Sequence, residues 1–127
     1  IINKYYFLIH KNDFKFASSF PSLTTLNIIN NFDDYSNYNI RIKELDLSSL
    51  TNIEHIKKQF LYGRLIENID FSHLKKLKTI GNEFLVDNTI IQKIDLSSSS
   101  QLSEIGDLFA GRCGRLQTVI FNKNANI

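Results

Sequence analysis

One seven-residue phrase recurs along this chain at a nearly constant interval. It reads Ile-Lys-Glu-Leu-Asp-Leu-Ser from Ile42 to Ser48, and it returns with small changes from Ile66 to Ser72 and from Ile91 to Ser97. A degenerate fourth copy covers residues 116–122, and the central branched residues 45, 69, 94 and 119 are 24, 25 and 25 positions apart. Self-similarity at a period of about 20–50 residues is typical of an array of units that bury their apolar faces against one another.

The apolar residues of the repeat fall in six columns when each copy is numbered from its central branched residue as position 0. Alternation between positions 0 and +2 predicts a short strand with one buried face. The columns at +8 and +11 are expected to point inward from the first arm, and the Phe residues at +15 to stack as an aromatic ladder inside the return arm. The members are Leu23, Ile42, Ile66, Ile91 and Leu116 at −3; Leu26, Leu45, Ile69, Ile94 and Val119 at 0; Ile28, Leu47, Phe71, Leu96 and Phe121 at +2; Ile53, Leu77 and Leu102 at +8; Ile56, Ile80 and Ile105 at +11; and Phe60, Phe84 and Phe109 at +15.

These columns predict an α/β repeat fold. We expect a solenoid with a parallel β-sheet on one face and short helical or 3₁₀ return segments on the other, with neighbouring coils about 4.8 Å apart. Gly81 and Gly106, both at position +12, are expected to mark a bend between the two arms.

The array is expected to cover residues 23–127 in about four to five coils, and residues 1–22 to form a decayed repeat or an N-terminal cap. The phrase at Leu23 is followed by the next at Ile42, earlier than the period predicts, so residues 30–39 are expected to form a shortened coil or a surface loop. Ile127 falls at position +8, which predicts an incomplete last coil with an open strand edge. Together with the absence of Met, this favours an excerpt, or a protein whose ends are covered by partners.

The phrase followed by Leu-x-x-Ile-Gly and Phe-x₃-Cys-x₂-Leu resembles the BspA-like class of leucine-rich repeats. The best single stretch runs from Ile91 to Leu116, and the resemblance covers about residues 23–127, most clearly 42–121. The chain departs from the family pattern because Arg64 and Asn88 stand where Cys113 stands in one repeat, and because the usual small residue before the Phe is absent. The resemblance implies a curved solenoid that mediates protein–protein contact or adhesion, an expectation by analogy of fold.

Composition excludes several classes of protein. The net charge is +2 at pH 7 and the charges are interspersed, so charge alone gives no reason to expect a nucleic acid or an acidic membrane as partner. No apolar run approaches the ~18–20 residues that cross a bilayer, and no signal peptide is recognisable. The single cysteine, Cys113, cannot form an internal disulfide or a multi-thiolate metal site. With no glycosylation sequon, these features slightly favour an intracellular location.

Three aspartates, Asp46, Asp70 and Asp95, occupy the outward position +1 and are expected to form a column on one sheet face. One interpretation is a structural ladder in which each carboxylate accepts hydrogen bonds from a nearby Ser or backbone amide. The others are a docking column for Lys or Arg of a partner and a cation site, although calcium would need six to eight oxygens. We expect that changing all three to Asn leaves the fold intact or stabilises it, because opposed like charges on a sheet cost stability.

Other polar groups favour surface or packing roles over catalysis. The basic residues of the middle of the chain are expected to lie on a solvated surface, because they do not share one repeat position; they are Arg41, Lys57, Lys58, Arg64, Lys75, Lys76 and Lys78.

Cys113 is expected to be a buried packing residue, since the three His lie in other coils. Ser97–Ser100 predicts a turn, and no phosphate loop or metalloprotease motif is present. We therefore expect no enzyme, no cofactor and no metal.

The first functional hypothesis is a non-catalytic interaction module that presents its sheet face to a protein partner. The outward residues of that face are Glu44, Asp46, Ser48, Asn68, Asp70, Ser72, Lys93, Asp95, Ser97, Thr118, Ile120 and Asn122. A second hypothesis is an architectural piece of a large assembly, a ribonucleoprotein or a virion, with its ends covered by neighbours; nucleic acid is expected as a partner only in that setting. A third is the targeting arm of a larger enzyme.

Overall fold

A computed structural model of the chain describes residues 6–8, 13–15, 23–29, 41–42 and 44–127. Within these ranges the regular structure consists of nine short strands, and no helix is present. All strand pairings are parallel. The strands are β1 (Tyr6–Leu8), β2 (Asp13–Lys15), β3 (Thr25–Ile29), β4 (Glu44–Asp46), β5 (His55–Ile56), β6 (Thr79–Ile80), β7 (Lys93–Leu96), β8 (Glu104–Ile105) and β9 (Thr118–Phe121).

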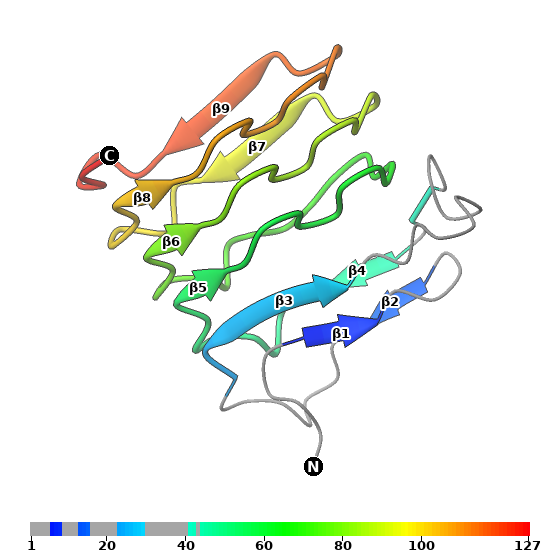
Figure 1. The fold of residues 1–127 in the computed structure, drawn as a ribbon. Helices are drawn as coiled ribbons and strands as arrows, with labels where there is room; N and C mark the ends of the chain where they lie inside the picture. Colours follow the sequence, from blue (N-terminus) through cyan, green and yellow to red (C-terminus); the bar gives the residue numbers. More distant parts are fainter. Residues whose placement is uncertain (1–5, 9–12, 16–22, 30–40, 43) are drawn as a thin grey trace.

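The larger sheet has the strand order β1-β3-β5-β6-β8, and Figure 1 shows these strands following one another from the blue end of the chain to the orange end. Thr79 pairs with His55 on one side and with Glu104 on the other. Each step to the next strand in this part of the sheet therefore advances the chain by one repeat. Each repeat of the sequence thus adds one strand to this part of the sheet.

The recurring phrase supplies β4, β7 and β9, which belong to a second set of parallel strands that pair as β2-β4 and β7-β9 (Figure 1). The register of β7 and β9 places Ile94 opposite Val119, which is the equivalent residue of the next repeat. The copy of the phrase at 66–72 departs from the pattern, because it forms no strand and only Leu65 bridges to Arg41. The expectation of a strand in this copy was wrong.

We attribute the irregular segment 66–72 to Arg64, which precedes it. The side chain of Arg64 is completely buried at position +19, where the next two repeats carry the smaller Asn88 and Cys113. Asn88 also fixes the backbone just before β7, since its Oδ1 accepts hydrogen bonds from the backbone N–H groups of Ile90 and Ile91 at 3.3 and 3.2 Å. A guanidinium accepts no hydrogen bond and is larger, so it cannot do the same for its own segment.

The register of the N-terminal strands corrects the sequence alignment. Leu26 pairs with Ile56, so Leu23 and Leu26 belong to the columns at +8 and +11 and not to those at −3 and 0. Position 0 of this repeat is instead filled by Phe14, which pairs with Leu45 in the β2-β4 ladder. The short interval between Leu23 and Ile42 is therefore the distance between two different strand types. The expected loop at 30–39 and the expected decayed repeat or cap at 1–22, apart from β1 and β2, lie outside the described residues.

The predicted columns form the core. Ile53, Ile56, Leu77, Ile80 and Leu102 are all buried. The Phe residues at +15 stack in the predicted ladder, with ring centroids 5.2 Å apart for Phe60 and Phe84 and 5.1 Å apart for Phe84 and Phe109. Phe71 packs against the rings of both Phe60 and Phe84.

The return segments contain turns in place of the expected helical or 3₁₀ structure. Every second residue there has positive φ, at positions +14, +16 and +18 of three successive repeats. These residues are Gln59, Leu61, Gly63, Glu83, Leu85, Asp87, Leu108, Ala110 and Arg112. Backbone hydrogen bonds between neighbouring segments, such as Leu85 N to Phe60 O at 2.9 Å, hold this conformation. A helix requires negative φ at each residue, so the alternation excludes it.

Candidate functional site

The residues expected on the partner-binding face come from β4, segment 66–72, β7 and β9, together with the residues that follow these strands. Their side chains are exposed or half-buried, apart from that of Glu44, which is outside the described part of the structure. The outward positions that the sequence predicted are thus accessible in four successive copies of the phrase.

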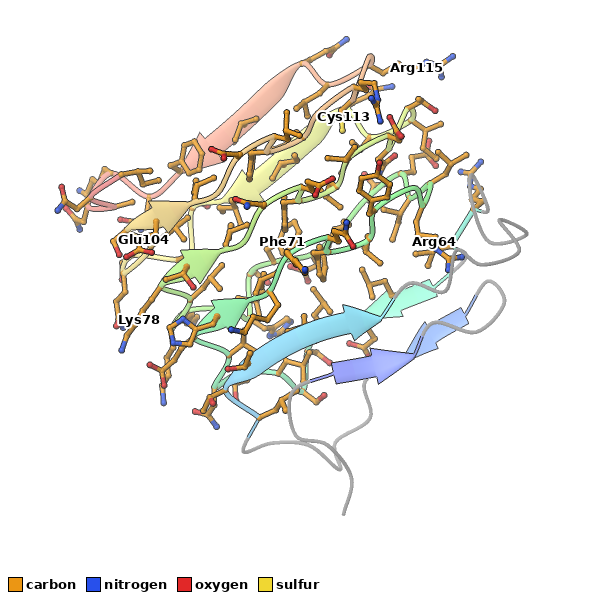
Figure 2. All side chains as sticks on the ribbon, viewed as in Figure 1. Arg64, Phe71, Lys78, Glu104, Cys113 and Arg115 are labelled. Carbon is orange, nitrogen blue, oxygen red and sulfur yellow. The ribbon has the colours of Figure 1, made fainter. Side chains whose placement is uncertain are left out.

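A hollow of about 270 Å³ lies on this face between segment 66–72 and β7. Six of the predicted residues line it: Asn68, Asp70, Ser72, Lys93, Asp95 and Ser97. Ile69, Phe71 and Ser98 complete the lining. Phe71 is otherwise buried and is labelled in Figure 2 at the centre of the molecule. The hollow coincides with the place where no strand ladder joins the two copies of the phrase among the described residues.

Each aspartate of the column makes the same local contact. Oδ1 of Asp46, Asp70 and Asp95 accepts the backbone N–H of the Ser two residues later, at 2.9, 2.9 and 3.0 Å. This geometry is the structural hydrogen-bond ladder that was one of the interpretations of the column. A carboxylate has about four acceptor sites, so Asp70 and Asp95 can accept further hydrogen bonds beside those from Ser72 and Ser97.

The hydrogen bonds set the charge state of two of these groups. Donation from Ser72, first from its side chain and then from its backbone, lowers the pKa of Asp70, although the neighbouring Asp46 acts in the opposite direction. Ser97 lowers the pKa of Asp95 in the same way. Both groups are therefore charged at neutral pH.

Two basic groups border the hollow. Lys93 Nζ is 3.9 Å from Asp95 Oδ2, and His73 Nε2 is 3.7 Å from Asp70 Oδ2. These separations are too long for hydrogen bonds. Among the residues that line the hollow, Asp70 and Asp95 against Lys93 give one net negative charge.

The predicted basic surface is confirmed for several lysines and is wrong for Arg64. Lys76 and Lys78 contact Asn52 and Glu54 of the preceding repeat, at 2.8 and 2.7 Å, from exposed positions. Arg64 is completely buried, and none of its three guanidinium nitrogens has a hydrogen-bond partner in the described structure (Figure 2).

Cys113 is half-buried, and its Sγ donates to the carbonyl of Leu85 at 3.1 Å. Burial raises the pKa of its thiol. No group of three or more His, Cys, Asp or Glu side chains able to hold a metal ion occurs in the described ranges.

A second, larger hollow of about 730 Å³ lies along the β5, β6 and β8 strands, and the sequence patterns did not predict it. Its lining includes His55, whose Nδ1 lies 2.8 Å from Oγ1 of Thr79, and also Lys57, Glu104 and Ile127. Gly81 and Gly106, both at position +12, are also among its lining residues.

The described part of the chain contains no helix of the length and apolar character that crossing a membrane requires. Comparison with known proteins finds no matching family model, no similar curated protein and no similar solved structure.

Proposed function

We propose that this chain is a non-catalytic protein-interaction module. In this proposal it is a leucine-rich-repeat solenoid of the BspA-like kind, and it binds a protein partner through the face of β4, segment 66–72, β7 and β9. The observation that carries the proposal is that six predicted outward residues from two copies of the phrase line one hollow.

The chemistry of the hollow favours a basic side chain of the partner. Asp70 and Asp95 are held charged by hydrogen bonds from Ser72 and Ser97, and both side chains line the hollow. Arg and Lys pair with such carboxylates, and Arg can do so through two parallel hydrogen bonds. The apolar parts of Ile69 and Phe71 at the floor can contact the methylene stem of either side chain.

The test is a chemical-shift titration of the 127-residue chain with capped tripeptides that differ only in a central Arg, Lys, Leu or Glu. We expect the Arg and Lys peptides to shift the amide signals of Asn68, Asp70, Lys93 and Asp95, and the Glu peptide to leave them unchanged. The shifts should weaken as salt is added, because exposed charges are screened.

The double variant Asp70→Asn and Asp95→Asn should abolish these shifts, since an amide keeps the acceptor for the Ser N–H but removes the charge. Asp107→Asn is the matched control, because Asp107 is an exposed carboxylate outside the hollow. Equal responses to the Arg and Glu peptides, or shifts that persist in the double variant, would contradict the proposal.

A further inference from the structure

The second hollow lies over strands that are paired on both sides. It extends along β5, β6 and β8, which follow one another in the larger sheet (Figure 1) and come from three successive repeats. β5 pairs with β3 and β6, and β6 pairs with β5 and β8. The surface over β5 and β6 therefore belongs to the interior of the repeat array. It shares no lining residue with the first hollow, which lies between segment 66–72 and β7.

Two lysines line the second hollow at its β5 end. Lys57 and Lys58 directly follow β5, and both side chains are exposed. Lys78 of the next repeat is engaged, since its Nζ lies 2.7 Å from a carboxylate oxygen of Glu54. Neither Lys57 nor Lys58 has such a partner among the described residues. Their two ammonium groups are therefore available to a ligand.

Polar groups beside the two lysines add hydrogen-bond donors. Asn82 Oδ1 accepts the backbone N–H of Asp107 at 2.7 Å, which leaves the Nδ2 group of this lining residue as a donor. His55 Nδ1 lies 2.8 Å from Oγ1 of Thr79, and this contact between neighbouring strands fixes the imidazole ring at the wall of the hollow. Donors next to cationic groups favour a ligand that is negatively charged and rich in acceptors.

The charges of the second hollow are separated along its length. Lys57 and Lys58 lie at the β5 end, whereas Glu104 belongs to β8. A nucleic acid that crossed all three strands would bring phosphates against Glu104, and the lining contains no Phe, Tyr or Trp on which a base could stack. A protein segment can carry carboxylates at one end only. Two strand spacings, about 10 Å, separate β5 from β8, and about three extended residues span this distance.

We propose that the second hollow binds an acidic segment of a protein, whose carboxylates pair with Lys57 and Lys58. Asn82 Nδ2 donates to the same carboxylates, and the rest of the segment crosses β6 towards β8. The volume of about 730 Å³ is within the range of ligand sites in proteins, about 300–1,000 Å³. This binding surface goes beyond the proposed function, because the first hollow favours a basic side chain and the second favours the opposite charge.

The test is a chemical-shift titration of the 127-residue chain with three probes: the capped dipeptide Glu-Glu, the capped dipeptide Gln-Gln and a thymidine trinucleotide with the same charge as Glu-Glu. We expect Glu-Glu to shift the amide signals of Lys57, Lys58 and Asn82. Gln-Gln should leave these signals unchanged, and the trinucleotide should bind more weakly than Glu-Glu. The signals of Asp70 and Asp95 should not respond to Glu-Glu, since they belong to the first hollow.

A double variant tests the role of the two lysines. Lys57→Gln with Lys58→Gln should raise the dissociation constant for Glu-Glu by about tenfold or more, because both charge attractions are lost. Lys75→Gln with Lys76→Gln is the matched control, since it removes the same charge from an adjacent, exposed lysine pair outside the hollow. This control should bind Glu-Glu as the wild type does.

Several results would overturn the proposal: no response of the wild type to Glu-Glu, equal responses to Glu-Glu and Gln-Gln, tighter binding of the trinucleotide, or equal losses in the two double variants. All of these are read from an acidic probe at the second hollow. The proposal for the first hollow is read from basic peptides at other residues, so the two proposals can fail separately.

Discussion

At the scale of single residues, position +19 separates the irregular repeat from its neighbours. Asn88 Nδ2 donates to the carbonyl of Ile66 at 2.9 Å, and Cys113 Sγ donates to that of Leu85, so each polar group hydrogen-bonds to a backbone carbonyl of an earlier segment. Arg64 makes no such bond within the described structure, and burial lowers the pKa of its guanidinium. A buried donor without an acceptor costs stability, and a charged one costs more.

We predict that Arg64→Met stabilises the chain. Methionine fills a similar volume without donors, so the free energy of unfolding should rise by about 1–3 kcal/mol, as measured by urea denaturation. Arg41→Met is the control: Arg41 is exposed and pairs with Glu67 at 2.9 Å, so its loss should change stability by less than about 1 kcal/mol. Lower stability of Arg64→Met would show that the guanidinium has a partner.

The aspartate column gives a prediction about pH. The folded-state pKa values of Asp70 and Asp95 are lowered, so their charged forms add stability above the unfolded-state pKa of about 3.9. This contribution is lost as the pH falls through the folded-state values. We therefore expect the wild type to lose stability on acidification over this range, and the triple variant with Asn at 46, 70 and 95 to lose less.

The same variant refines the expectation from the sequence alone. The fold should survive, because Asn keeps the acceptor for the Ser amide, but at neutral pH the variant should be slightly less stable than the wild type. The reason is that hydrogen bonding from Ser72 outweighs repulsion from Asp46 in setting the pKa of Asp70. Parallel acid curves for variant and wild type in thermal denaturation would refute this account.

At the scale of elements, Gly81 and Gly106 lie where the backbones of neighbouring repeats approach closely. A Cβ on Gly81 would lie 2.5 Å from the backbone N of Lys58 and 2.8 Å from the carbonyl carbon of Lys57. A Cβ on Gly106 would collide with Asn82. The sequence pattern interpreted these glycines as a bend between two arms, whereas the structure shows proximity between successive repeats as the reason for glycine at both positions.

We predict that Gly81→Ala and Gly106→Ala each lower the free energy of unfolding by about 1–3 kcal/mol, the usual cost of overpacking. Gly114→Ala is the matched control, since no atom lies within 4 Å of its added Cβ, and it should be neutral or slightly stabilising. Chemical denaturation of the three variants measures this. Equal effects at all three positions would mean that the backbones are further apart than described.

The elements also show what periodicity can and cannot predict. The phrase located β4, β7 and β9, whereas the +8 and +11 columns predicted inward-facing residues but not the strands β5, β6 and β8 that they form. Both strand types contain the spacing Leu-x-x-Leu, so sequence alone could not assign Leu23 and Leu26 to the right one. The alternating positive φ of the return segments has no residue signature, because nearly all of these residues are not glycine.

The candidate site was predictable to the same degree. Alternation about the buried column identifies the outward residues of each copy, and six of these do share a hollow. The hollow itself was not predictable, because it opens where segment 66–72 leaves the strand conformation. We attribute that departure to the buried Arg64, which the pattern had placed on the surface.

At the scale of the whole molecule, the repeats are joined by contacts that keep the sequence period. Side chains pair between Glu54 and Lys78, between Asp87 and Arg112, and between Asn122 and the carbonyl of Ser97, each one repeat apart. The Phe ladder runs through the same interfaces. Since each repeat contacts only its neighbours, stability should depend on how many neighbours a repeat has.

Truncation of the ladder tests this dependence. Phe84 is completely buried between Phe60 and Phe109, so Phe84→Ala should lower the free energy of unfolding by about 3–5 kcal/mol. Phe109 is only half-buried, and Phe109→Ala should cost roughly half as much, in proportion to the apolar area it removes from water. Both variants are measured by chemical denaturation. If Phe84→Ala left the melting temperature unchanged, the ladder would not be the core, and equal losses in the two variants would mean that burial of the ring does not set its contribution.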